Sequence, residues 1–215
     1  MGTGANAIRT WHHVGMSKRA LIVVDVQNDF CEGGSLAVVG GAAVATAISE
    51  FLEREGMGYD FVVATRDHHI DPGAHFSDAP DFVDSWPPHC VADTPGASFH
   101  PNLMNRPFDA VFDKGDFAAA YSGFEGFASS DDELIGLGDW LDAMRVRSVD
   151  VCGIATDYCV KATALDAARH GLSTTMLLDL TAAVDPASVP SVVEDLAAAG
   201  VRVRSADADE GYPGR

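Results

Sequence analysis

The sequence predicts an α/β protein in which a parallel β-sheet carries helices on both of its faces. Short runs rich in Val, Ile, Leu and Ala recur along the chain, without the apolar–polar alternation of a sheet that has one wet face. Segments with helical periodicity separate these runs, as they do where helical crossovers join parallel strands. The length of 215 residues and the hydrophobic content of 47% suit one domain with a full core.

The expected elements follow from these patterns in chain order. Buried strands are predicted at 20–26, 61–65, 149–153, 174–178 and 201–203. Helices are predicted at 42–55, 156–170 and 189–199, and Gly171 ends the second of them. Residues 66–108 are rich in Asp, His and Pro and show little periodicity, and an irregular stretch of this length inside a compact domain is usually functional or disordered. The histidines and Trp86 favour a functional role for it.

Residues 18–205 are interpreted as a single domain, 1–17 as a flexible N-terminal extension and 206–215 as an acidic C-terminal tail. The start of the chain lacks the apolar stretch of a signal peptide, and no apolar run approaches the roughly 20 residues of a membrane helix. The formal net charge of −18 would repel phosphate backbones and anionic lipid, so neither nucleic acid nor membrane is an expected partner. The four cysteines form no C-x-x-C pair, which favours reduced thiols in the cytoplasm.

Three reactive side chains follow predicted apolar segments. Ligands of open parallel sheets bind beyond the carboxyl ends of the strands, which makes Asp25, Lys114 and Cys159 candidate functional groups. Asp25 ends the first strand, where a helix cap or a salt bridge is the alternative to a catalytic role. Lys114 precedes a glycine, and taken alone it would be interpreted as a solvated surface lysine.

Cys159 falls in the first turn of the helix predicted at 156–170. Free backbone N–H groups and the helix dipole favour a thiolate at that place, and the same N–H groups can bind an oxyanion. A nearby lysine ammonium would lower the thiol pKa further. The alternative is a buried structural cysteine, which suits Cys152 inside the preceding strand better.

A candidate metal site follows the second predicted strand. In an extended segment Asp67 and His69 point to one side while His68 points to the other. His75 and His89 follow within the same irregular stretch. Carboxylate and imidazole ligands suit Zn, Fe or Mn, and such a set leaves coordination positions open for water or substrate. The alternative is a loop that holds several histidines without a metal.

These residues lie in motifs that resemble the bacterial nicotinamidase/pyrazinamidase group of the isochorismatase-like cysteine hydrolases. The resemblance extends over residues 18–204. It rests on RALIVVDVQNDFCEGGSLAV, the 67–75 stretch, WPPHCV at 86–91, FDKG at 112–115, AYSGF at 120–124 and GIATDYCV at 153–160. It implies a three-layer α/β/α fold with a six-stranded parallel sheet.

The resemblance also implies roles for individual residues. It implies a catalytic triad of Asp25, Lys114 and Cys159, and an oxyanion hole from the backbone N–H groups of Ala155 and Cys159 beside a cis peptide before Ala155. It implies one divalent metal ion held by Asp67, His69 and His89, with His75 a ligand in some members. The residues implied to enclose the substrate ring are Phe30, Leu36, Trp86, Tyr121, Ile154 and Tyr158. His68 departs from the family pattern, which usually has Trp or Phe there, and the strand pleat favours His69 as the ligand.

The implied reaction is hydrolysis of nicotinamide to nicotinate and ammonia through a thioester, with pyrazinamide as a further substrate. A cytoplasmic monomer or small homo-oligomer is expected. The nearest alternatives are an N-carbamoyl amidohydrolase or an isochorismatase of the same fold, which lack the Asp67, His69 and His89 set. A non-catalytic metal-binding relative is a third alternative, and the intact triad argues against it. A generic flavodoxin-like binding domain lacks support, because the chain has no glycine-rich phosphate loop.

Overall fold

The computed structural model of the protein describes residues 17–130 and 133–206. The predicted N-terminal extension and acidic tail lie outside these residues, apart from Ser17 and Ala206. Among the helices of the described part, none is both long and apolar enough to cross a membrane.

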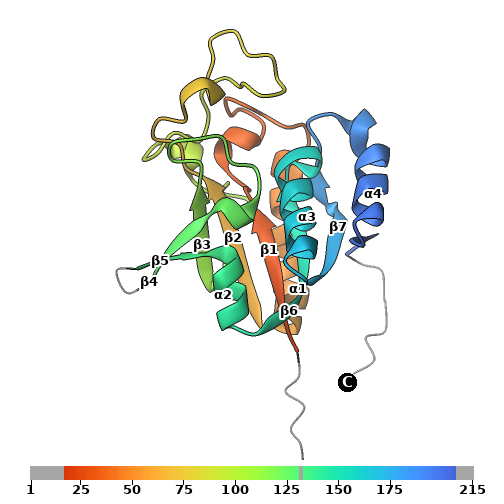
Figure 1. The fold of residues 1–215 in the computed structure, drawn as a ribbon. Helices are drawn as coiled ribbons and strands as arrows, with labels where there is room; N and C mark the ends of the chain where they lie inside the picture. The colour runs from red at the N-terminus through yellow and green to blue at the C-terminus, as the bar shows by residue number, and fades with distance from the viewer. Residues whose placement is uncertain (1–16, 131–132, 207–215) are drawn as a thin grey trace, which may run out of the picture.

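A single mixed sheet runs through the molecule (Figure 1). Its strands are β1 (Lys18–Val24), β2 (Phe61–Asp67), β3 (Ala110–Lys114), β4 (Phe127–Ser130), β5 (Glu133–Gly136), β6 (Val146–Ile154), β7 (Ser173–Ala182) and β8 (Arg202–Arg204). They lie in the order β5-β4-β3-β2-β1-β6-β7-β8. The six strands from β3 to β8 in that order are mutually parallel, which confirms the predicted parallel sheet. The structure adds β3, which was not among the strands predicted by residue range, and the short strands β4 and β5. β4 and β5 join the β3 edge in antiparallel pairing and bring the described sheet to eight strands.

Helices cover both faces of this sheet (Figure 1). They are α1 (Gly41–Glu55), α2 (Leu137–Ala143), α3 (Lys161–Arg169) and α4 (Val189–Ala198). Shorter 3-10 helices lie at Asn28–Phe30, Gly56–Gly58, Gly73–His75, Pro95–Ala97, Gly123–Glu125 and Pro186–Ser188. Helix α1 packs on one face, and α2, α3 and α4 pack on the other. The predicted three-layer arrangement is therefore present.

The core explains why the strands lack alternation. In β1, Leu21 and Val23 join the hydrophobic cluster on the α1 side, whereas Ile22 and Val24 join the cluster on the α2–α4 side. All four side chains are fully buried. Because each face of β1 is covered, successive residues must all be apolar, and the continuous apolar run follows.

The helix predicted at 156–170 is divided into two parts. Thr156–Val160 forms a π-helical turn, in which the N–H of Val160 donates to the carbonyl of Ala155, and α3 follows from Lys161. The Ile154–Ala155 peptide bond is cis, as the resemblance implied.

The carboxyl ends of β1, β2, β3 and β6 meet beneath the long loops in the upper part of Figure 1. Central strands β1 and β6 approach each other closely there. A Cβ on Gly153, which has a φ of +120°, would lie only 2.0 Å from the carbonyl oxygen of Val24. Glycine at this position therefore lets the loop after β6 reach the end of β1, which brings Cys159 toward Asp25.

Candidate active site

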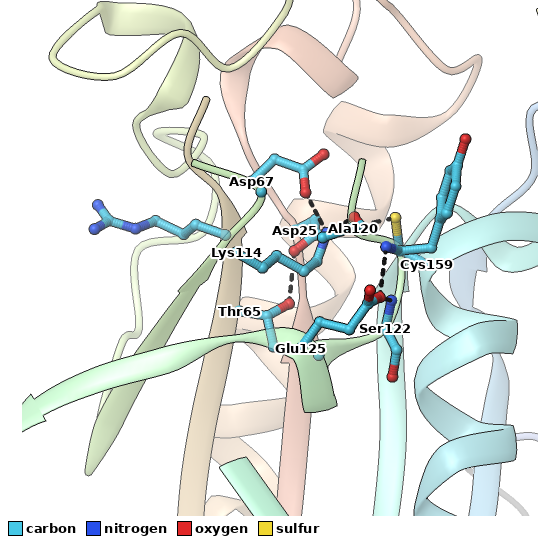
Figure 2. A network of polar contacts seen from close by, with 12 residues as sticks. Asp25, Thr65, Asp67, Lys114, Ala120, Ser122, Glu125 and Cys159 are labelled. Carbon is cyan, nitrogen blue, oxygen red and sulfur yellow. Dashed lines mark hydrogen bonds and ion pairs between the residues drawn. The ribbon is translucent and has the colours of Figure 1, made fainter. Parts of the chain in front are cut away.

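Lys114 lies between the other two predicted catalytic groups, Asp25 and Cys159, at the centre of the site (Figure 2). Its Nζ lies 2.9 Å from Oδ2 of Asp25 and 3.8 Å from Sγ of Cys159, and it donates to the carbonyl of Ala120 at 3.0 Å. The three side chains come from the ends of β3 and β1 and from the turn after β6. The structure thus brings the proposed triad together from segments far apart in the sequence.

Asp25 is fully buried just beyond β1, with a φ of 49°. Its Oδ1 accepts a hydrogen bond of 2.6 Å from the hydroxyl of Thr65, while Oδ2 faces Lys114. Burial raises the pKa of the Asp25 carboxyl, and the Lys114 charge and the Thr65 hydrogen bond only partly oppose this shift. A carboxylate with a raised pKa is a stronger proton acceptor than an ordinary one.

Lys114 remains a cation despite complete burial. Burial lowers the pKa of its ammonium group, but the carboxylates of Asp25 and Asp67 outweigh that effect and hold the pKa well above the usual range. Its position therefore supplies a fixed positive charge between two carboxylates and a sulfur atom.

The environment of Cys159 differs from the sequence expectation. Burial raises the pKa of the Cys159 thiol well above its usual value, and the Asp25 and Asp67 carboxylates add to the shift, while Lys114 lowers it only in part. The helix start was expected to favour the thiolate, whereas burial is the largest effect on the thiol pKa in the structure. The thiol therefore needs an adjacent base to take its proton, and Asp25 lies beside it.

Three buried histidines form a cluster next to the triad. His69, His75 and His89 each offer one ring nitrogen, and these nitrogens lie within 4.8 Å of one another. His69 Nε2 and His75 Nδ1 are buried and find no hydrogen-bond partner among the described residues. Unpartnered buried nitrogens are costly unless something binds them, so this donor set fits a divalent metal ion.

Backbone carbonyls set the tautomers of two of these histidines. His69 Nδ1 lies 2.7 Å from the carbonyl of Gly115, and His89 Nδ1 lies 2.8 Å from that of Pro87. A carbonyl only accepts, so each Nδ1 carries the proton and each Nε2 presents a lone pair. Burial and the two neighbouring imidazoles lower the pKa of His75 to about 4, which keeps that ring neutral near pH 7.

Asp67 connects the two groups of residues. Its Oδ1 is in direct contact with Lys114 Nζ, whereas its Oδ2 lies 3.6 Å from His69 Nε2 and 3.7 Å from His89 Nε2. Burial raises the pKa of Asp67, but Lys114 and the two histidines outweigh burial and hold the pKa well below its usual range. One carboxylate therefore faces both the triad and the histidine cluster.

His68 lies outside this cluster, as the strand pleat predicts. Its Nδ1 lies 2.7 Å from Oδ1 of Asp116, and its side chain is partly exposed. His69, by contrast, is completely buried. Only His69 can join the cluster in this register.

A cavity opens onto both groups. It is lined by Phe30, Leu36, Val38, Asp67, His75, Trp86, His89, Ala120, Tyr121, Ala155, Tyr158, Cys159 and Val184. Aromatic side chains form one wall of the cavity. The indole N–H of Trp86 donates to the Tyr121 hydroxyl at 3.1 Å, and the Trp86 ring packs edge-on against the ring of Tyr158. An apolar cavity with a few convergent polar groups suits a small flat ligand.

Five of the six residues expected to enclose a substrate ring line this cavity, and Ile154 does not. Ile154 lies at the end of β6 on the same face as Cys152, so its side chain is buried in the core on the α1 side. The pleat of the strand directs it away from the cavity.

Sequence reasoning missed several contributors. Thr65 ends the strand predicted at 61–65, and its type carries no signal of the bond to Asp25. Glu125 accepts from the backbone N–H groups of Tyr121 and Ser122, which fixes the loop whose Ala120 carbonyl meets Lys114 (Figure 2). The spacing of Ser122 and Glu125 is that of a capping box, so this signal was available in the sequence.

Comparisons with known proteins identify the family of the chain. A family model described as the isochorismatase domain matches residues 19–208. The chain is 56% identical over 185 residues to the nicotinamidase/pyrazinamidase of Mycobacterium tuberculosis, which covers 86% of this chain and 97% of that relative.

Two solved structures share both fold and sequence. The pyrazinamidase of Pyrococcus horikoshii in complex with zinc is 35% identical with a TM-score of 0.74, covering 87% of this chain and 99% of that one. PnC1 of L. infantum in complex with nicotinate is 36% identical with a TM-score of 0.77, covering 89% and 94%. Both its sequence and its fold therefore show that the chain belongs to the isochorismatase family.

Proposed function

We propose that this chain is a metal-containing cysteine amidohydrolase that converts nicotinamide to nicotinate and ammonia, and that it also hydrolyses pyrazinamide. The observation that carries the proposal is the meeting of the Asp25, Lys114 and Cys159 group with the three-histidine cluster at one apolar cavity. The relative from M. tuberculosis bears this pair of activities in its name, and the L. infantum neighbour holds nicotinate, the acid product of the reaction.

In the first half of the reaction, Asp25 takes the proton of the Cys159 thiol as the sulfur attacks the carboxamide carbon. Burial raises the pKa of both groups: it makes the Asp25 carboxylate a stronger proton acceptor, and it makes the thiol depend on that acceptor as the sulfur attacks. Lys114 stabilises the negative charge that the pair shares. The backbone N–H groups of Ala155 and Cys159 hold the oxyanion, and Asp25 then returns the proton to the departing ammonia, which leaves a thioester on Cys159.

In the second half, water attacks the thioester carbon. Asp25 accepts a proton from that water and passes it to the sulfur as the C–S bond breaks, and the acid that is released ionises to nicotinate. The products are nicotinate and the free thiol of Cys159. The same carboxylate thus serves each half-reaction, which its burial beside both Lys114 and the sulfur allows.

Asp67, His69 and His89 would hold the metal ion, and His75 offers a further ligand. When bound, the ion supplies a Lewis acid that binds the ring nitrogen of a pyridine or pyrazine amide. The aromatic wall of Trp86 and Tyr121 encloses the ring. This set also separates the proposed function from N-carbamoyl amidohydrolases and isochorismatases of the same fold, which lack it.

Ammonia release tests the proposal directly. Protein stripped with a chelator and reloaded with Zn, Fe or Mn is assayed on nicotinamide, pyrazinamide and benzamide. Release from the first two amides, with little from benzamide, is the expected result, since benzamide has no ring nitrogen. Equal ammonia release from all three amides would show that the ring nitrogen is not recognised. No ammonia release with any of the metals would overturn the proposed activity.

The proposed setting is the cytoplasm, with the protein acting as a monomer or small homo-oligomer and without a nucleic-acid or membrane partner. The free state of all four cysteines supports a reducing compartment. The net charge of −18 supports the absence of polyanionic partners.

A further inference from the structure

The segment that follows β1 carries two polar side chains that the triad does not use, one buried and one half-buried. They are Gln27 and Asp29, which alternate along the chain with Asp25. Gln27 is completely buried, and all of its bonds are to main-chain atoms.

Gln27 holds the main chain of Asp67 from both sides of the residue. Its Oε1 accepts from the N–H of Asp67 at 2.9 Å, and its Nε2 donates to the carbonyl of the same residue at 2.7 Å. The second proton of Nε2 goes to the carbonyl of Ala97 at 2.9 Å. The side-chain amide is therefore satisfied by Asp67 and the loop beyond His89.

The bonds between Gln27 and Asp67 take the place of strand pairing beyond the end of β1. The β1–β2 ladder ends at the pairing of Val24 with Thr65, and Asp25 turns away with a φ of 49°. On the other side of β2, Asp67 still pairs with Lys114 of β3. In a continued parallel ladder, two peptide groups of β1 would bond to the N–H and the carbonyl of Asp67. The single Gln27 amide makes both bonds instead, so it extends the pairing for the one residue that carries the shared carboxylate.

Asp29 holds the main chain of the segment that carries His89. Its Oδ2 accepts from the N–H of Cys90 at 2.8 Å, while the Cys90 carbonyl accepts from the N–H of His69 at 3.0 Å. A Cβ on Gly96 would lie 2.1 Å from Asp29 Oδ2, so the neighbouring loop closes tightly on this carboxylate. Cys90, the residue that follows His89, is thereby held between Asp29 and the main chain of His69.

We propose that Gln27 and Asp29 are positioning residues for the metal ion: Gln27 fixes the ligand Asp67, and Asp29 fixes the ligand His89. The inference rests on the metal site of the proposed function. A metal ion binds more tightly when the ligand atoms are already held at the right separation. Residues that hydrogen-bond to the ligand residues without touching the ion typically change the metal affinity by about tenfold or more. Neither residue lines the cavity, so neither touches substrate.

Zinc affinity of the full chain, measured by competition with a chromogenic chelator, tests the proposal without any turnover. Gln27→Met keeps the length of the side chain and removes all three bonds. Its zinc dissociation constant is expected to rise about tenfold or more. The matched control is Tyr59→Phe, which removes a 2.8 Å bond to Asp150 that lies away from the metal ligands. The control is expected to lose thermal stability and to keep zinc affinity within about twofold.

Two further variants keep the test decisive if Gln27→Met does not fold. Gln27→Glu retains the acceptor for the Asp67 N–H but sets an oxygen against the carbonyls of Asp67 and Ala97, and Asp29→Asn weakens the bond to Cys90. Both should bind zinc more weakly at a temperature where circular dichroism shows them folded. Wild-type zinc affinity in the folded variants, or an equal loss in Tyr59→Phe, would overturn the inference. A wild-type protein that binds no zinc would instead remove the metal from the proposed function, and this inference with it.

Discussion

Cys152 and Cys159 are both buried, yet only one of them lies at the cavity. Cys159→Ala is expected to abolish ammonia release while leaving the fold intact, because no other group at this position can form a thioester. Cys152 lies in the core on the α1 side, so Cys152→Ala should keep the activity and lower stability by about 1 kcal/mol. The measurements are ammonia release and thermal unfolding of both variants, and turnover by Cys159→Ala above background would exclude it as the nucleophile.

Lys114 is expected to act on Cys159 through its charge. Its ammonium lowers the thiol pKa, so Lys114→Met removes that effect and raises a pKa that burial already holds high. Alkylation requires the thiolate, and its rate against pH should therefore shift to higher pH in the variant. The pH profile of iodoacetamide labelling checks this, and superimposable profiles would reduce the triad to an Asp–Cys pair.

The same substitution should also destabilise the metal-free protein. Lys114 is the cation beside two buried carboxylates, Asp25 and Asp67. Removing one partner of a buried ion pair leaves an uncompensated charge and costs about 3–5 kcal/mol. Denaturant unfolding of Lys114→Met, compared with wild type, measures this cost.

Residue types, spacing and the family resemblance together predicted most of the side chains that meet at the site, but not Thr65 or Glu125 and not the contacts. Asp67 and His69 follow from the pleat of one strand, and the structure places both in the same cluster. The helix start at Cys159 was visible in the sequence, whereas the depth of burial that raises its thiol pKa was not. Ile154 was assigned to the cavity from the family pattern, while its own strand parity directs it into the core.

At the scale of elements, the turn that ends β3 is shaped for the ring of His69. Gly115 has a φ of +86°, and a Cβ there would lie 2.6 Å from His69 Cε1. Gly115→Ala is therefore expected to displace His69 and to weaken zinc binding. Gly171→Ala is the matched control, because Gly171 has a φ of +89° and open space around it. The control should cost only the backbone strain, about 1–2 kcal/mol, and equal zinc affinity in both variants would contradict the prediction.

Most of the strands that sequence reasoning found are buried on both faces, although β8, predicted at 201–203, is partly exposed. Strands β1, β2, β6 and β7 were recognisable because their apolar runs are continuous. Strands β4 and β5 are four residues each, with exposed Phe127 and Leu134, so burial imposes no clear pattern on them. Helix α2 spans seven residues, too few for a 3.6-residue period to stand out. The π-helical turn before α3 was invisible because its residues also suit an α-helix.

At the scale of the whole molecule, the metal is expected to stabilise the fold. An ion that binds the folded chain and not the unfolded one raises the unfolding temperature with its concentration. Zinc added to stripped protein should raise that temperature in wild type and in His68→Ala, whose side chain lies outside the cluster. His69→Ala and His89→Ala should lose most of the increase. Thermal unfolding with and without zinc decides this, and a response lost in His68→Ala but kept in His69→Ala would reverse the assignment.

The Asp67 carboxylate faces Lys114 with one oxygen and the histidines with the other, and this double contact affects how the chain could change over evolutionary time. Substituting a histidine of the cluster removes one ligand and leaves the ion pair of Asp67 with Lys114 in place. Substituting Asp67 removes a ligand and one of the two counter-charges of a buried lysine in the same step. In a descendant that no longer binds the metal, substitutions of the histidines would therefore destabilise the fold less than a substitution of Asp67. Such a descendant is expected to keep the aspartate as the counter-charge of Lys114.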